Sequence, residues 1–153
     1  MQKAQKGKLE IFDASQYRLG IVVTQFNYDI TEKLLKSALV SAQKYHVPQA
    51  NISIFRVAGS IEIPLFLKKL GESKKYDCLV ALGAIIRGET AHFDYVAKIV
   101  SEGVLRIMLD LGIPVGFGIL TCDNLKQAEI RVDSGARAIE AALQNAKLMK
   151  GLR

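Results

Sequence analysis

A histidine follows a buried apolar run at a spacing that suits proton transfer beside a bound anion. Residues 78–86 are almost entirely apolar, the run breaks at Gly88, and a helical pattern begins near His92. Ligands of open α/β sheets bind at the carboxyl ends of strands, where the next helix directs N–H groups at an anion. Imidazole exchanges protons near neutral pH. The segment, with Thr90 beside His92, therefore predicts an anion site next to an acid–base group, against the alternative that a lone histidine such as His46 simply ends or begins a helix.

Strand-like and helix-like segments alternate along the chain, which is typical of a parallel sheet with helices on both faces. Strands are predicted at Gly20–Thr24, Ile52–Val57, Cys78–Ile85 and Val115–Leu120, with a short additional strand near Leu9–Phe12. Helices are predicted at Ile30–Tyr45, Pro64–Leu70, Phe93–Leu111, Leu125–Val132 and Gly135–Met149. No repeat or low-complexity linker divides the chain, so we expect a single domain over residues 1–153, with residues 1–8 as a flexible N-terminus.

The composition argues against several classes of protein. Half of the 153 residues are apolar, no apolar run has the length of a membrane span, and the basic N-terminus lacks the apolar region of a secretory signal. We therefore expect a cytoplasmic protein without a membrane segment. The two cysteines and two histidines form no metal-ligand motif, so no metal site is expected. The net charge of +6 is spread over solvated helix faces without a nucleic-acid motif, so no nucleic-acid partner is expected either.

The residues whose types could bind a ligand follow the four predicted core strands. They are Phe26 and Asn27 after the first strand, Gly59–Glu62 after the second, Arg87–His92 after the third, and Phe117–Thr121 at the end of the fourth. Carboxyl ends of parallel strands share one edge of the sheet, where a binding crevice forms. We therefore expect these four segments to meet at one site.

The amino-acid sequence of these segments resembles that of the lumazine synthase family. The signature is Gly83-x-Ile-Ile-Arg-Gly-Glu-Thr-x-His-Phe-Asp-Tyr-Val96, and three further blocks keep the family's order, namely Phe26–Asn27, Val57–Pro64, and Pro114–Thr121 with Asn124, Gln127, Ala128 and Arg131. The resemblance runs from about Leu19 to Leu148. It implies a flavodoxin-like, doubly wound three-layer α/β sandwich with a four-stranded parallel sheet, to which we add the short N-terminal strand.

The resemblance also implies an activity. Family members are transferases of riboflavin biosynthesis that condense 5-amino-6-ribitylaminouracil with 3,4-dihydroxy-2-butanone 4-phosphate to 6,7-dimethyl-8-ribityllumazine, phosphate and water, with no cofactor. Two alternatives share the fold. An archaeal-type riboflavin synthase would not be expected to carry the full Arg87–Tyr95 motif. A non-catalytic flavin-binding or shell-forming protein would not be expected to retain both His92 and Arg131.

The resemblance assigns substrate-binding roles that the residues alone leave open. Phe26, which could equally cap the core, stacks on the pyrimidine ring, and Asn27 orients that ring. Ala84, Ile85 and Ile86, otherwise plain strand residues, contribute backbone contacts to the pyrimidine edge. The turn of Ser60, Ile61 and Glu62, otherwise a helix start, holds the ribityl hydroxyls; Ile61 stands where the family usually has an aromatic residue.

By the same resemblance, the phosphate is held by Gly88, Glu89 and Thr90 through N–H groups and the Thr90 hydroxyl, while the Glu89 carboxylate points away. His92 is the catalytic residue and transfers protons. The role of Arg87 stays open.

The family also forms its sites between subunits of a homopentamer. Phe117 closes the site from a neighbouring subunit, Arg131 matches the phosphate-binding arginine, and Arg137 is aligned with a family lysine across a shortened loop. The short Asp133–Arg137 connection favours an icosahedral shell of pentamers over a free pentamer, with riboflavin synthase as a candidate partner.

Overall fold

The computed structural model describes residues 4–153 and has one parallel sheet of four strands. The strands are β1 (Leu19–Thr24), β2 (Ile52–Val57), β3 (Cys78–Ile86) and β4 (Val115–Cys122), in the order β2-β1-β3-β4. This is the strand order of flavodoxin-like folds without a fifth strand. The α-helices are α1 (Tyr28–Lys44), α2 (Ile63–Glu72), α3 (His92–Leu111), α4 (Leu125–Glu129) and α5 (Ser134–Gly151). Two short 3₁₀ helices, Gln49–Asn51 and Ser60–Glu62, flank β2.

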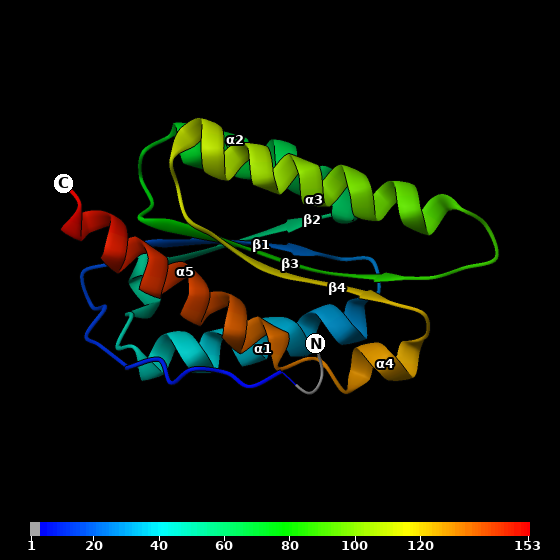
Figure 1. Ribbon diagram of the computed structural model, residues 1–153, viewed down its shortest axis with the longest axis horizontal. Helices are drawn as coiled ribbons and strands as arrows, with labels where there is room; N and C mark the ends of the chain where they lie inside the picture. The colour runs from blue at the N-terminus through cyan, green and yellow to red at the C-terminus, as the bar shows by residue number, and fades with distance from the viewer. Residues whose placement is uncertain (1–3) are drawn as a thin grey trace.

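The sheet is the middle of three layers, because α2 and α3 cover one face while α1, α4 and α5 lie on the other (Figure 1). Successive residues of β1 serve opposite faces: Ile21 and Val23 belong to the core under α1 and α5, whereas Val22 belongs to the core under α2 and α3. All three side chains are fully buried, and each such burial stabilises the fold by about 1.5–3 kcal/mol. The apolar runs of the sequence are continuous because the central strands have no solvent face. No helix in residues 4–153 has the length and apolar character to cross a bilayer.

The segment before β1 differs from the sequence prediction. Residues 9–12 were expected to form a short strand, but residues 4–14 have no regular secondary structure and pair with none of the four strands. The segment lies against the helical layer instead: Phe12 packs edge-on against Tyr45 with ring centroids 5.3 Å apart, and the Gln144 side chain of α5 donates to the Glu10 carbonyl at 2.6 Å. Of the predicted flexible residues 1–8, residues 1–3 lie outside the described part and residues 4–8 are exposed.

Helix α5 approaches β4 unusually closely at Gly116. A Cβ atom placed on Gly116 would lie 2.0 Å from the Ala138 carbonyl oxygen of α5, a distance that no side chain can occupy. Glycine at this position therefore allows the helix to lie directly on the strand.

We predict that Gly116→Ala lowers the free energy of unfolding by about 1–3 kcal/mol or more, because the contact is with backbone that cannot rotate away. The measurement is the denaturant midpoint. The matched control is Gly7→Ala, which enters open space and should shift stability by less than about 0.5 kcal/mol. Equal midpoints for the two variants would contradict the close approach of α5 to β4.

Candidate active site

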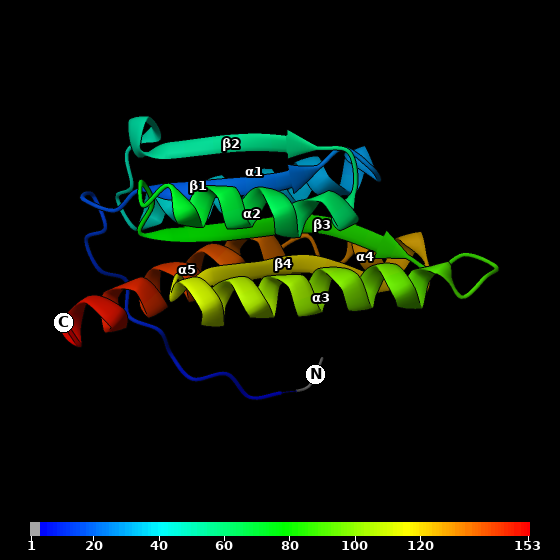
Figure 2. The same cartoon turned by 90° about the horizontal axis from the view of Figure 1, so that it is seen from above.

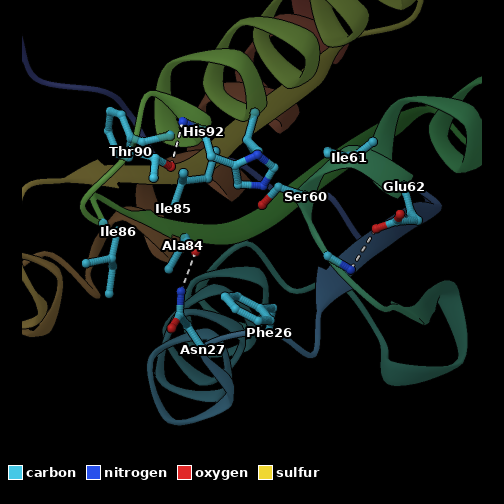
Figure 3. Close-up of a pocket in the computed structure, with 14 residues that line it drawn as sticks. Phe26, Asn27, Ser60, Ile61, Glu62, Ala84, Ile85, Ile86, Thr90 and His92 are labelled. Atoms are coloured by element: carbon cyan, nitrogen blue, oxygen red, sulfur yellow. Dashed lines mark hydrogen bonds between the residues drawn. The ribbon is translucent and has the colours of Figure 1, made fainter.

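A cavity of about 380 Å³ lies at the carboxyl edge of the sheet, a volume typical of small-molecule sites. Three of the four predicted strand-end segments meet there (Figure 3). The lining residues are Phe26, Asn27, Gly59, Ser60, Ile61, Glu62, Ala84, Ile85, Ile86, Gly88, Thr90, His92, Phe93 and Val96. Phe93 and Val96 were not among the predicted site residues, although Val96 follows His92 by one helical turn and so shares its face of α3.

The cavity exists because β3 continues beyond β1. Pairing between these strands ends at Val23 and Leu82, whereas β3 runs on to Ile86 beside β4. The Arg87 N–H donates to the Cys122 carbonyl at 2.9 Å, on the β4 side. The N–H and carbonyl of one residue point to the same side of a strand and those of the next residue to the other side, so the N–H and carbonyl of Ile86 point to the side that β1 has left. That side opens into the cavity.

Asn27 and Phe26 turn the chain from β1 into α1. Asn27 has the left-handed conformation, with φ 57°, which asparagine tolerates better than most residues. Its side-chain amide donates to the Ala84 carbonyl at 2.8 Å and so occupies the first position that β1 vacates on β3. The Phe26 ring is 71% exposed and points into the cavity (Figure 3). An exposed aromatic face in a cavity is suited to stacking on a planar ring.

The turn after β2 presents a carboxylate. Oε2 of Glu62 accepts a hydrogen bond from the Gly59 N–H at 2.9 Å, which closes the turn at the start of the following helix. Within residues 4–153 no group bonds to Oε1 of Glu62, and the ionised carboxylate can only accept. One oxygen of the Glu62 carboxylate therefore stabilises the turn, and the other is a free acceptor.

The loop between β3 and α3 presents backbone donors. Within residues 4–153, no protein group accepts a hydrogen bond from the N–H groups of Gly88, Glu89 and Thr90. A Cβ on Gly88 would meet nothing within 4 Å, so the loop stands clear of other groups. Helix α3 begins at His92 and its dipole adds partial positive charge at this end. These donors and the helix end together can hold a dianion.

His92 stands between that loop and the cavity. Its backbone N–H lies 3.3 Å from the Thr90 hydroxyl, and its imidazole points into the cavity toward Ser60 (Figure 3). By contrast His46, the other histidine, takes a left-handed conformation just after α1 and does not line the cavity. His92 is therefore placed to move protons on a bound molecule, whereas His46 terminates a helix.

Four of the predicted binding residues do not line the cavity of this chain. Glu89 is exposed in the loop between β3 and α3. Phe117 is 45% exposed on the edge strand β4. Arg131 donates to the Gln127 carbonyl at 2.7 Å, and Arg137 pairs with Asp133. Among the lining residues there is no Lys or Arg, so one chain supplies backbone amides and one imidazole but no lysine or arginine side chain.

The other titratable clusters give no sign of metal binding. Residues 4–153 contain no group of three or more His, Cys, Asp and Glu side chains that could hold a metal ion. Burial raises the pKa of the Cys78 thiol to about 12, so this cysteine stays protonated inside the sheet.

Comparison with known proteins identifies a family model and relatives that share one enzyme name. A family model described as 6,7-dimethyl-8-ribityllumazine synthase matches residues 16–150. Two curated relatives, from Nitratidesulfovibrio vulgaris strains DP4 and Hildenborough, carry the same name. Each is 41% identical to this chain over 145 residues, which span 92% of this chain and 93% of the relative.

Proposed function

The chain belongs to the 6,7-dimethyl-8-ribityllumazine synthase family, and we propose that the cavity at the sheet edge is its active site. The protein is a transferase of riboflavin biosynthesis. It condenses 5-amino-6-ribitylaminouracil with 3,4-dihydroxy-2-butanone 4-phosphate. The observation that carries this proposal is that an exposed aromatic ring, an open strand edge and an imidazole surround one cavity together with Gly88 and Thr90, whose N–H groups have no partner within residues 4–153.

The ribitylaminouracil fits the β1–β3 side of the cavity. Its pyrimidine is planar and bears N–H and carbonyl groups along its edge, which complement the Phe26 face and the open Ile86 peptide. The ribityl chain is a polyol, and the free Oε1 of Glu62 is an acceptor for its hydroxyls. We assign Asn27, Ser60, Ile61, Ala84 and Ile85 to the same substrate.

The butanone phosphate fits the α3 side. Its dianion is the kind of group that helix N-termini and free backbone amides bind, so we assign it to the loop from Gly88 to Thr90. The ketone carbon then lies between the phosphate and the amine of the other substrate.

His92 transfers protons at each step of the reaction. The amine adds to the ketone and loses water to form an imine, the phosphate leaves by elimination, and ring closure expels a second water. Each step takes a proton from nitrogen or carbon and gives one to oxygen. A single imidazole within reach of both substrates can do this in turn, as a general base and then as a general acid.

The absence of lysine and arginine from the residues that line the cavity supports a site shared between subunits. We propose that a neighbouring copy supplies Phe117, Arg131 and Arg137, of which Arg131 binds the phosphate with the planar, bidentate geometry of guanidinium. The assembly would then be a homopentamer, or the icosahedral shell that the short Asp133–Arg137 connection favours. We propose further that residues 1–153 act as one domain in the cytoplasm, with riboflavin synthase as a candidate partner.

We predict that His92→Ala slows turnover by about 100-fold, the low end of general acid–base contributions, because each step also proceeds slowly in solution. The KM values for both substrates should stay close to those of the parent. The assay incubates both substrates with purified protein and follows the fluorescence of the lumazine. A turnover rate equal to the parent's would remove His92 from the mechanism.

We predict that Arg131→Ala raises the KM for the butanone phosphate far more than the KM for the ribitylaminouracil, because only the former carries a phosphate. Arg131→Lys should recover part of the loss, since lysine keeps the charge but not the bidentate fork. Steady-state kinetics with each substrate varied in turn provide the measurement. An equal rise for both substrates contradicts the phosphate assignment.

We predict that His92→Ala and Arg131→Ala subunits restore activity when they are dissociated together and reassembled, because some shared sites then contain both residues. Light scattering first establishes an assembly of at least a pentamer, and subunit exchange is verified with a labelled chain. Mixed assemblies that stay as slow as the two parents would show that each site is built within one chain.

A further inference from the structure

Arg87 joins three elements around the loop from Gly88 to Ala91. The N–H groups of this loop are the proposed donors to the phosphate, and the loop leads into His92. Its guanidinium donates to both carboxylate oxygens of Asp94, each at 3.3 Å, and to Oδ1 of Asp123 at 3.2 Å. The same group lies over the Phe93 ring, 4.2 Å from the ring centroid. Phe93 and Asp94 are the second and third residues of α3, and Asp123 follows β4 directly. One side chain from the end of β3 thus holds the first turn of α3 to the end of β4.

Besides Arg87, the first turn of α3 is supported by Phe93 and Val96, which are partly buried against the core under α2 and α3, but it has few polar contacts. The loop from Gly88 to Ala91 is exposed and projects beyond the end of the sheet (Figures 1 and 2). Ala91, the residue before the helix, has no side chain that can cap it. The hydrogen bond from the His92 N–H to the Thr90 hydroxyl is long and remains within the loop itself. The orientation of His92 therefore depends on this apolar packing and on the polar contacts of Arg87 with Asp94.

We propose that Arg87 is a positioning residue for His92, because its contacts to Phe93, Asp94 and Asp123 keep the first turn of α3, and hence the imidazole, in a fixed orientation toward the cavity. This role rests on the proposed function of His92 in proton transfer. A catalytic group displaced by about 1 Å can lose up to about 100-fold in rate, so a tether of this kind acts on turnover.

Two other roles for Arg87 fit the structure less well. The ion pairs are largely exposed, since the Arg87, Asp94 and Asp123 side chains are 42%, 61% and 67% accessible, and exposed pairs contribute little to overall stability. A phosphate ligand would need free donors facing the cavity. Arg87 does not line the cavity, and its donors are directed to two carboxylates, first Asp94 and then Asp123, which raise its pKa.

The test is a double-mutant cycle between Arg87→Met and His92→Ala. Methionine keeps an apolar stem over Phe93 but removes every donor. In the parent background we expect kcat to fall roughly tenfold while both KM values stay within about twofold. In the His92→Ala background we expect the same substitution to change the rate by less than about twofold, because a residue that acts through His92 has nothing left to position. Arg87→Lys should lie between the parent and Arg87→Met.

Asp94→Asn provides a second variant, since it removes the bidentate partner at an exposed position and should reproduce the loss. The matched control is Arg56→Met, which breaks the Arg56–Glu32 pair away from the cavity, removes an arginine about as exposed as Arg87, and should leave kcat unchanged in both backgrounds. Light scattering and the thermal midpoint confirm that each variant assembles and folds.

The outcomes distinguish the positioning role of Arg87 from the catalytic role of His92. An unchanged kcat for Arg87→Met, or an equal loss with and without His92, overturns the positioning role and leaves the function of His92 intact. A rise in KM for the butanone phosphate alone would make Arg87 a phosphate ligand and also overturns it. If His92→Ala turns over at the parent rate, the catalytic assignment of His92 is wrong, and the positioning role that rests on it is wrong as well.

Discussion

The site depends on a mismatch in the length of two neighbouring strands. Strand β1 stops pairing with β3 at Leu82, and of the four strands in residues 4–153 only β4 pairs with β3 from there to Ile86. A strand edge buried without partners would cost free energy for each unmet peptide group. Asn27 meets one of these groups through its amide, and we infer that the substrate pyrimidine meets the next. The left-handed turn at Asn27, the position of Phe26 and the start of α1 all follow from where β1 ends.

A second constraint is electrostatic. The loop after β3 offers amides and the end of α3 to an anion, but one chain lines the cavity with no lysine or arginine. Partial charges at a helix end stabilise an anion only modestly on their own, by about 0.3–1 kcal/mol at exposed sites. The arginines near this edge are engaged within the chain: Arg87 with Asp94 and Asp123, and Arg137 with Asp133. The proposal that a neighbouring copy contributes Arg131 to the phosphate site rests on this arrangement.

Much of the fold could be predicted from the sequence because its signals are local. The strands are apolar runs that fill both faces of a central sheet, and all four were predicted to within two residues at each end. The helices begin and end near Pro64, Gly112 and Asn124, whose backbone preferences do not depend on distant contacts. Residues 9–12 have a similar apolar pattern but form no strand, because in this chain Phe12 packs against the aromatic rings of Tyr17 and Tyr45 rather than beside a strand edge.

The sequence by itself determined the kinds of residue at the site and their order, since parallel strands deliver their carboxyl ends to one edge. It thereby identified Phe26, Glu62 and His92 as neighbours, although they are far apart along the chain. Only the tertiary structure decided which groups face one cavity: Phe117 is the third residue of β4 and Arg131 follows α4, and both lie outside that cavity. It also decided the partners of Arg87, because a guanidinium seven residues from one carboxylate and 36 from another can contact both only when β3, β4 and α3 are packed together.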